Sequence, residues 1–569
     1  MNDPLLEFVM PCHVRVISLL LFTLLSLGDA VAQGIFSNGF EGTSNRATSL
    51  GNNLDGVADY ASSYNFVDAM KQSRTWITQN TQSGIFDTED AACLDLDANG
   101  YVQSMTPKAG CAAPNYNAVG TLFFFGDLNG HYPSGRYVVT YEGQGDISYH
   151  FAATKNLALS APGRDVLDVN AANGGWMMRI DAITAGNHPR NIHVWMPGFD
   201  EGNGPAQRFH PDFLALIAHN RVLRFMDWMG TNGSSAEHFV DRPQVDDVRW
   251  TEGQMPIEVM VDLANRVNAD PWFNMPHRAT DDYMTQFASL VKSLLRADRL
   301  VYVEYSNEVW NGQFSQGNYI EDQGTATFGA QGSGFDRRLN WHGLRTAQMC
   351  DLWKATWGTE ADRVVCVLGA QAANAYTQTQ AADCPMWTTG RPCTGHGLAA
   401  VAIAPYFGGY IGGPEYQSVV QGWTLDDLFS ELTSGGQLSG GPSGGAIAET
   451  AGWIASHRSA ANTRSLSLIA YEGGQHLVGI FGVENNNAIT DLLTSANRDP
   501  RMGQAYAAYL SQWKAQGGEL FVNFTASGDY SKWGSWGAVE FLDQPSTPKQ
   551  QALRDFGLSH PCWWAGCAD

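Results

Sequence analysis

Two glutamates follow apolar segments that are typical of buried strands. Glu308 stands in "LVYVEYSNEVWNG" (residues 300–312), and Glu472 stands in "LIAYEGGQH" (residues 468–476). Two carboxyl groups that flank one bond can cleave a glycosidic linkage, one as general acid/base and the other as nucleophile. A retaining reaction places the two groups about 5–5.5 Å apart. This chemistry therefore requires a fold that brings two distant segments of the chain together.

Each glutamate also has a structural interpretation. Glu308 could cap a helix or form a salt bridge, and Glu472 could be structural, because Gly473-Gly474 permits close approach of the chain for any purpose. Glu304 has the same strand parity as Glu308 and competes with it as an acid. Because Glu304 lies deeper along the strand, we expect it to be paired inside the fold.

A closed ring of parallel strands would bring the two glutamates together. Apolar β-rich segments alternate with helical patterns from Pro205 onward, as in a parallel sheet that is buried on both faces. The segments are 221–229, 271–275, 300–306, 363–370, 398–406, 466–472 and 518–525, and 48–57 can supply the first strand. Helical periodicity marks 282–296, 337–357 and 503–516. Eight βα units predict an α/β fold, a (β/α)8 TIM barrel whose active site lies at the carboxyl ends of the strands.

The interval between the first two expected strands is too long for one helix. Residues 96–204 contain short alternating strands between turns, which predicts an inserted β-sandwich. Its aromatic residues either bind carbohydrate or form its core. The predicted catalytic barrel is therefore discontinuous, comprising residues 49–95 and 205–560, and residues 561–569 form a C-terminal tail with a possible disulfide.

The N-terminal segment has the pattern of a signal peptide. The apolar segment 17–27 is too short to span a bilayer, and Ala30-Val31-Ala32 follows it, which predicts cleavage after Ala32. An uncleaved anchor is the alternative, and translation starts at Met1 or at Met10. Residues 1–32 are thus expected to be removed and residues 33–48 to form a flexible tail, giving a secreted or periplasmic protein without membrane attachment.

Composition supports export and excludes some partners. The formal net charge is −23, which argues against binding to nucleic acid or to an anionic membrane. Eight cysteines follow the signal peptide, and an even number on an exported chain suggests disulfides. Proximity in sequence favours the pairs 93–111, 350–366, 384–393 and 562–567.

The motifs around the two glutamates resemble those of the retaining TIM-barrel glycoside hydrolases of clan A. That resemblance rests on the Asn-Glu pair in "SNEVWN" after the fourth strand and on the Glu in "YEGGQ" after the seventh. It implies that Glu308 is the acid/base, that Glu472 is the nucleophile and that Asn307 binds the sugar 2-hydroxyl. The inserted segment 96–204 departs from the simplest members, so the subfamily is not placed.

Other residues match the resemblance less specifically. Arg224 in "LRFMDW" is similar to an Arg beside the nucleophile, although it could instead brace Asp227 or another carboxylate. The remaining candidates for substrate binding lie near strand ends, where each could also serve packing alone: Tyr406, His277, His476, Trp310, Trp533 and Trp536.

The sequence thus predicts an exported retaining glycoside hydrolase acting on a polysaccharide such as a β-glucan, mannan or xylan. No cofactor and no metal are expected, because neither H-E-x-x-H nor G-x-G-x-x-G occurs in a fitting context. A non-catalytic glycan-binding protein and a polysaccharide lyase are the alternatives. The sugar, the linkage and internal as opposed to terminal cleavage are left open.

Overall fold

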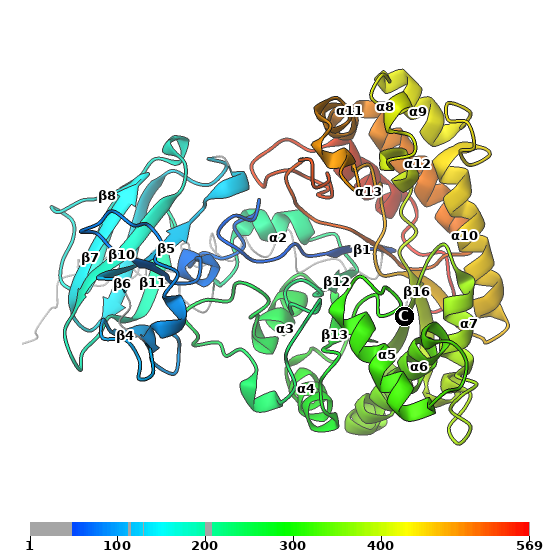
Figure 1. The fold of residues 1–569 in the computed structure, drawn as a ribbon, viewed down its shortest axis with the longest axis horizontal. Coiled ribbons are helices and arrows are strands. Elements are labelled where there is room, and N and C mark those ends of the chain that lie inside the picture. Colours follow the sequence, from blue (N-terminus) through cyan, green and yellow to red (C-terminus); the bar gives the residue numbers. More distant parts are fainter. Residues whose placement is uncertain (1–47, 112–114, 129, 200–206, 568–569) are drawn as a thin grey trace, which may run out of the picture. The chain divides into compact units, whose positions relative to one another are not determined.

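Eight parallel strands close into a barrel with helices around it (Figure 1). The structure is a computed structural model that describes residues 48–111, 115–128, 130–199 and 207–567. In chain order the barrel strands are β1 (Leu50–Asn53), β12 (Val222–Arg224), β13 (Asp270–Met275), β14 (Val301–Tyr305), β15 (Val364–Ala370), β16 (Leu398–Ile403), β17 (Ser467–Ala470) and β18 (Phe521–Asn523). Each expected segment overlaps one of these strands, so the predicted TIM barrel is confirmed.

Helices connect the barrel strands. They are α2 (Pro211–Ile217), α3 (Ile257–Arg266), α4 (Asp281–Leu294), α5 (Ser315–Phe328), α6 (Gly334–Trp357), α7 (Ala375–Asp383), α8 (Gln417–Val420), α9 (Leu425–Thr433), α10 (Gly445–Asn462), α11 (Asn487–Arg498), α12 (Pro500–Ala515) and α13 (Pro548–Ser559). In α4 the Thr280 side chain caps the first turn and Asp281 complements the helix dipole. Most of its apolar residues recur at helical spacing and are buried, as the periodicity predicts.

Strand parity decides which side chains fill the barrel. Val222, Trp272 and Tyr302 belong to one apolar cluster inside it. Two residues further along two of these strands, Arg224 and Glu304 point to the same side, because successive side chains of a strand alternate. The barrel therefore has an apolar lower layer and a charged layer toward the carboxyl ends of its strands.

Two four-stranded sheets lie between β1 and β12 in the chain. One contains β2 (Ile77–Gln79), β5 (Ala118–Phe123), β10 (Trp176–Ile183) and β7 (Gly145–Phe151), and the other contains β11 (Arg190–Trp195), β6 (Gly135–Glu142), β9 (Arg164–Val169) and β8 (Ala153–Lys155). Both sheets contribute side chains to one core, so they form a sandwich. The short pair β3 (Asp95–Leu96) and β4 (Val102–Ser104) stands apart from both sheets. Because β2 belongs to the sandwich, its sheets begin N-terminal to the expected boundary at residue 96.

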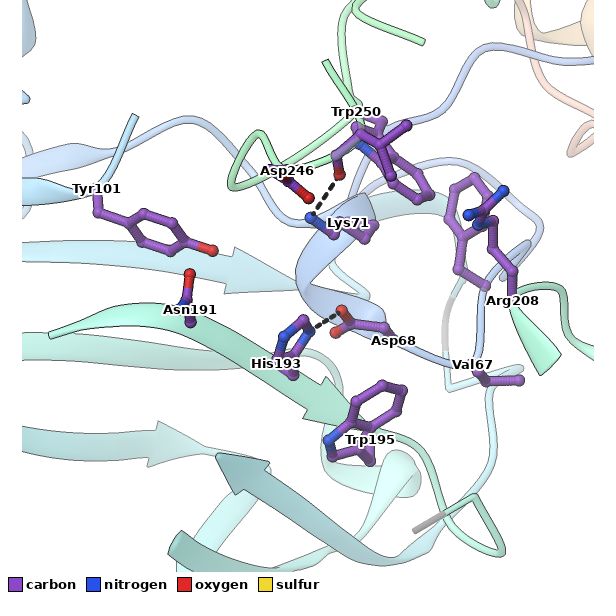
Figure 2. Close-up of a pocket in the computed structure, with 12 residues that line it drawn as sticks. Val67, Asp68, Lys71, Tyr101, Asn191, His193, Trp195, Arg208, Asp246 and Trp250 are labelled. Atoms are coloured by element: carbon purple, nitrogen blue, oxygen red, sulfur yellow. Dashed lines mark hydrogen bonds and ion pairs between the residues drawn. The ribbon is translucent and has the colours of Figure 1, made fainter. Parts of the chain in front are cut away.

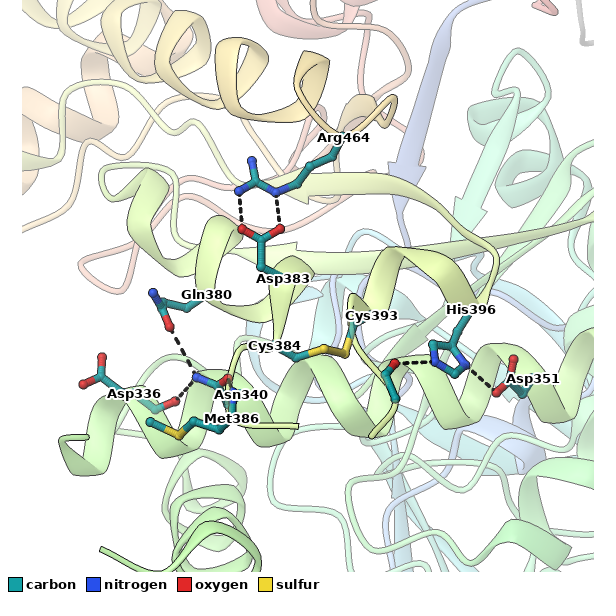
Figure 3. Close-up of a disulfide and its surroundings, with 11 residues drawn as sticks. Asp336, Asn340, Asp351, Gln380, Asp383, Cys384, Met386, Cys393, His396 and Arg464 are labelled. Atoms are coloured by element: carbon teal, nitrogen blue, oxygen red, sulfur yellow. Dashed lines mark hydrogen bonds and ion pairs between the residues drawn. A yellow bond between two sulfur atoms is a disulfide. The ribbon is translucent and has the colours of Figure 1, made fainter. Parts of the chain in front are cut away.

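Three of the four expected cysteine pairs are disulfides: Cys93–Cys111, Cys384–Cys393 and Cys562–Cys567. Figure 3 shows the second, which closes a loop after α7 beside the ion pair of Asp383 with Arg464. The expected pair of Cys350 and Cys366 is wrong, because both are free thiols. They contact each other in the core between α6 and β15, where burial raises the pKa of the Cys350 thiol and shields both groups from oxidants.

The expected signal peptide, 1–32, and all but the last residue of the expected tail, 33–48, lie outside the described residues. In the part of the chain that the structure describes, no helix combines the length and the apolar character needed to cross a bilayer.

Candidate active site

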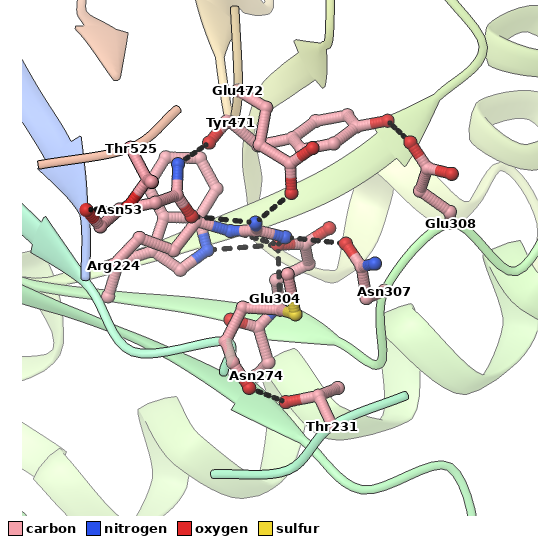
Figure 4. A network of polar contacts seen from close by, with 12 residues as sticks. Asn53, Arg224, Thr231, Asn274, Glu304, Asn307, Glu308, Tyr471, Glu472 and Thr525 are labelled. Carbon is pink, nitrogen blue, oxygen red and sulfur yellow. Dashed lines mark hydrogen bonds and ion pairs between the residues drawn. The ribbon is translucent and has the colours of Figure 1, made fainter. Parts of the chain in front are cut away.

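The chain leaves β14 through residues with unusual backbone angles. Ser306 has φ +60° and Glu308 has φ +44°, in the left-handed region that side chains disfavour. Such conformations cost about 1–3 kcal/mol each and persist where the surroundings impose them. They turn the chain so that Asn307 reaches Arg224 and Glu308 reaches Tyr471 (Figure 4).

Glu472 follows β17 and is almost fully buried. Its carboxylate accepts a hydrogen bond of 2.8 Å from Arg224 Nη1 and one of 3.0 Å from the Tyr406 hydroxyl. The next residue must be small, because a Cβ on Gly473 would lie 2.7 Å from the Phe521 ring. The Gly-Gly sequence thus permits the close packing that fixes the position of Glu472.

Arg224 is the centre of the polar layer inside the barrel. Its guanidinium donates to Glu304 (2.9 Å from Nη2), to Glu472 and to Asn307 (2.8 Å), and it lies 4.9 Å from the centroid of the Tyr471 ring. Burial alone would lower the pKa of Arg224, but the charges of Glu304 and Glu472 outweigh it and raise that pKa. The interpretation that Arg224 braces a carboxylate and the expectation that it lies beside Glu472 therefore both hold.

Glu304 is paired inside the barrel, as its depth in the strand predicts. It accepts hydrogen bonds from Trp272 Nε1 at 3.0 Å and from Asn274 Nδ2 at 2.8 Å, in addition to the guanidinium of Arg224. These donors satisfy the buried charge and leave Glu304 unsuited to proton transfer with a substrate. Its contacts instead hold the guanidinium in place for Glu472.

Replacing Glu304 by Gln is expected to lower the free energy of unfolding by about 3 kcal/mol, because removal of one partner leaves the other charge of a buried pair uncompensated. Guanidinium denaturation of the purified variant measures the change. We also expect kcat to fall, since Arg224 loses one of its two charged anchors.

Glu360→Gln is the matched control for this substitution. Glu360 pairs with Arg363 on the surface, and its side chain is 42% exposed. An exposed pair contributes about 0–1 kcal/mol, so the control should unfold almost like the parent protein. Equal stabilities of the two variants would contradict the anchoring role of Glu304.

The two candidate catalytic carboxyls differ in their partners. Burial raises the pKa of both Glu308 and Glu472, and the negative charge of Glu308 raises that of Glu472 further. Two close carboxyls of this kind share one proton over a range of pH. Glu472 carries the ion pair with Arg224, whereas Glu308 has only the Tyr471 hydroxyl (2.9 Å) and the Asn311 amide (3.3 Å). Arg224 favours the charged form of Glu472, while burial and the charge of Glu308 oppose it and raise the pKa of Glu472 to about 8.

Asn307 is held by a chain of amides. Its Oδ1 accepts from Arg224, and its Nδ2 donates to Asn232 Oδ1 at 3.1 Å. Gln316 Nε2 in turn donates to Asn232 Oδ1 at 2.7 Å and to the Asn307 carbonyl at 3.0 Å. The Asn307 side chain is therefore held in one orientation, between Arg224 and Asn232.

Three of the aromatic candidates form a wall next to Glu472. The Tyr406 ring packs edge-on against His476 and Trp536, whose ring centroids lie 5.6 and 5.8 Å away. Phe524, which directly follows β18, contacts the same group. Burial lowers the pKa of His476, so the ring is a neutral part of this wall.

The other three candidates lie elsewhere. His277 is buried, its carbonyl accepts from the Tyr305 hydroxyl, and burial lowers the pKa of its ring to about 4. The carbonyl of Trp310 accepts from Arg338 under the loop after β14. Trp533 is 67% exposed, and its carbonyl accepts a hydrogen bond from Trp536 Nε1. None of the three has a direct contact with Glu308 or Glu472 within the described ranges.

Sequence reasoning did not single out several residues of the polar layer. Asn53 at the end of β1 donates to the Tyr471 carbonyl at 2.9 Å and accepts from Arg224 Nη1 at 3.1 Å. Asn274 interrupts the apolar segment of β13, and Tyr471 contacts Glu308 from the end of β17. These residues could have been found in the sequence as polar residues that close or interrupt an apolar strand.

A separate cavity of about 190 Å³ lies beside strand β11 of the sandwich (Figure 2). Two of its charged or titratable side chains are already paired: His193 Nδ1 contacts Asp68 at 2.8 Å, and Lys71 Nζ donates to the Asp247 carbonyl at 2.6 Å. Trp195 and Trp250 are buried, so they present no open ring to a sugar. Carbohydrate binding by the sandwich stays a prediction.

Comparisons with known proteins find solved structures that resemble parts of this chain. No protein-family model matches, and no curated protein is similar in sequence. A 4-O-α-L-rhamnosyl-β-D-glucuronidase from Fusarium oxysporum matches 61% of this chain and 65% of its own (12% identity, TM-score 0.35). A GH5-4 broad-specificity endoglucanase from Bacteroides salanitronis matches 62% of this chain and 84% of its own, with 13% identity and a TM-score of 0.36. A Bacteroides ovatus GH5 xyloglucanase matches 78% of this chain and 96% of its own, with 10% identity and a TM-score of 0.32. Similarities of this extent do not identify an activity.

Proposed function

We propose that this protein is a retaining glycoside hydrolase that cleaves a β-glucan-, mannan- or xylan-like polysaccharide by double displacement. The observation that carries the proposal is the placement of Glu308 and Glu472 at the ends of β14 and β17, with opposite electrostatic roles. Glu472 is held as the anion by Arg224 and Tyr406. Burial raises the pKa of Glu308, whose hydrogen bonds come from the neutral Tyr471 and Asn311 side chains, so Glu308 is suited to act as the acid.

The reaction follows from these two states. The Glu472 carboxylate attacks the anomeric carbon while Glu308 donates its proton to the departing glycosidic oxygen, which leaves a glycosyl ester on Glu472. Glu308, now an anion, then removes a proton from water as the water oxygen attacks the same carbon and releases Glu472. Asn307 is placed to bind the sugar 2-hydroxyl, in line with the resemblance to clan A.

Export is part of the same proposal. Three disulfides are typical of a protein that matures in an oxidising compartment. Together with the signal-peptide pattern of residues 1–32, they support a secreted or periplasmic location. N-terminal sequencing of the exported protein tests the expected cleavage after Ala32.

A panel of β-glucans, mannans and xylans tests the activity. We expect release of reducing sugar from at least one of them, and the first product seen by ¹H NMR should have the same anomeric configuration as the cleaved linkage. Inverted product would exclude the double displacement. Unsaturated products that absorb ultraviolet light would indicate a lyase, and binding without any product would indicate a glycan-binding protein.

A further inference from the structure

A cavity of about 370 Å³ lies between the segment after β13 and the helices α5 and α6, which pack side by side (Figure 1). His277 and Arg278 line it from the segment after β13, and Tyr319 lines it from α5. Trp341 and Leu344 contribute an apolar wall from α6. Small-molecule sites in proteins usually have volumes of about 300–1,000 Å³, so this cavity is large enough for a single sugar unit.

The ring of His277 is a buried polar group without a partner. The residue is only 3% exposed, and its Nδ1 atom is closed off from solvent and has no hydrogen-bond partner within the described residues. Nε2 has no partner there either, so Nε2 is the ring nitrogen that faces the cavity. The ring packs edge-on against Tyr319, with 5.1 Å between the centroids, and the Tyr305 hydroxyl holds the His277 carbonyl. Because buried polar side chains are nearly always hydrogen-bonded, this ring points to a ligand in the cavity.

The other available polar groups of the cavity are hydrogen-bond donors. The Arg278 guanidinium lies 5.5 Å from the centroid of the Tyr319 ring and has no carboxylate or hydrogen-bond partner within the described residues. Arg345 also lines the cavity, but it pairs with Asp281 and donates to Gln348 Oε1, which leaves the Gln348 amide nitrogen available. The described residues that line the cavity include no Asp or Glu. The cavity therefore offers a positive charge and N–H groups to an anion.

The size and the walls of the cavity narrow the class of anion. A guanidinium matches the two oxygens of a carboxylate with two parallel hydrogen bonds, and it can hold phosphate or sulfate in the same way. An inorganic anion, however, has no apolar part to pack on Trp341 and Leu344. A hexuronic acid combines one carboxylate with the C–H groups of a sugar ring, and those groups gain from contact with an apolar wall.

We propose that this cavity is a binding site for a hexuronic acid. Its carboxylate accepts hydrogen bonds from Arg278 and from His277 Nε2, and its ring packs on Trp341 and Leu344. The site is separate from Glu308 and Glu472, neither of which lines the cavity. The proposal therefore goes beyond the hydrolase function, and binding alone tests it, whether or not the protein hydrolyses a glycan.

Calorimetric titration of the wild-type protein with sodium D-glucuronate tests this site near neutral pH, and D-glucose and inorganic phosphate are the comparison probes. We expect glucuronate to bind at least about tenfold more tightly than glucose, because glucose lacks the group that makes the charged hydrogen bonds. Phosphate should bind more weakly than glucuronate, since it makes no contact with the apolar wall. Equal affinity for glucuronate and glucose would overturn the proposal, and so would phosphate that binds as tightly as glucuronate.

Two substitutions locate the binding. Arg278→Gln alters an exposed side chain, so it should spare the fold and lower the affinity for glucuronate at least about tenfold. His277→Phe keeps an aromatic ring beside Tyr319 but removes the donor, and it should lower that affinity at least about threefold. Circular dichroism checks that both variants are folded.

Arg136→Gln is the matched control for these substitutions. Arg136 is an exposed arginine on β6 of the sandwich, outside the cavity lining, so its replacement should leave the affinity for glucuronate unchanged. Glucuronate that binds to Arg278→Gln as tightly as to the wild type would place the anion elsewhere and overturn the proposal.

Discussion

Glu472→Ala is expected to lower kcat by roughly 10⁴- to 10⁶-fold, the range seen when an enzyme loses its nucleophile. Without the carboxylate, no glycosyl ester can form at the anomeric carbon. The substitution also leaves Arg224 with Glu304 as its charged partner and opens space where the carboxyl stood. The measurement is the initial rate on a β-linked aryl glycoside of the active sugar.

Azide distinguishes a lost nucleophile from a damaged fold. The small anion fits the vacated space beside Arg224 and attacks the anomeric carbon directly, so activity should return with a glycosyl azide of inverted configuration. The wild-type protein under the same conditions should give retained product. Activity of the variant that equals that of wild type without azide would remove Glu472 from the mechanism.

Glu308→Gln is expected to lower kcat on polysaccharide by about 10²- to 10⁴-fold, the usual contribution of a general acid. Gln keeps the shape and can still accept from Tyr471, but it has no proton to give. An aryl glycoside with a dinitrophenolate leaving group needs no such proton. On this substrate the glycosyl ester should therefore still form at a rate near that of the wild type. Azide should accelerate the breakdown of that ester and give a product of retained configuration.

The pH profile supplies an independent readout for Glu308. The acid is active only while protonated, so kcat/KM of the wild type should fall as pH rises through the pKa of Glu308. Burial raises that pKa, which places the loss on the alkaline side of the usual carboxyl range. In Glu308→Gln this alkaline decline should disappear. An unchanged profile in the variant would assign the acid role to another group.

Opposite azide products separate the two roles. Inversion with Glu472→Ala and retention with Glu308→Gln together identify the nucleophile and the acid/base. The reverse pattern would exchange the assignments, and the hydrogen bonds of Arg224 and Tyr406 to Glu472 would then be structural.

Part of this arrangement could be predicted because it is local in sequence. Apolar segments that alternate with helical patterns are sufficient to predict a barrel, and the residue that closes each strand then lies at its mouth. Glu308, Glu472 and Arg224 could be located in this way. Proximity in sequence also predicted three disulfides correctly, namely Cys93–Cys111, Cys384–Cys393 and Cys562–Cys567. Proximity failed for Cys350 and Cys366, whose thiols are free and are buried where the helix packs on the sheet.

The sequence by itself determined the strand order of the barrel and which acidic residues stand at its carboxyl ends, because both follow from short-range periodicity. Only the tertiary structure decided which polar groups contact each carboxyl. That depends on Arg224, Tyr406 and Tyr471, which reach the two glutamates from other strands. Side-chain contacts of this kind depend on register and closure around the ring, which no local pattern encodes.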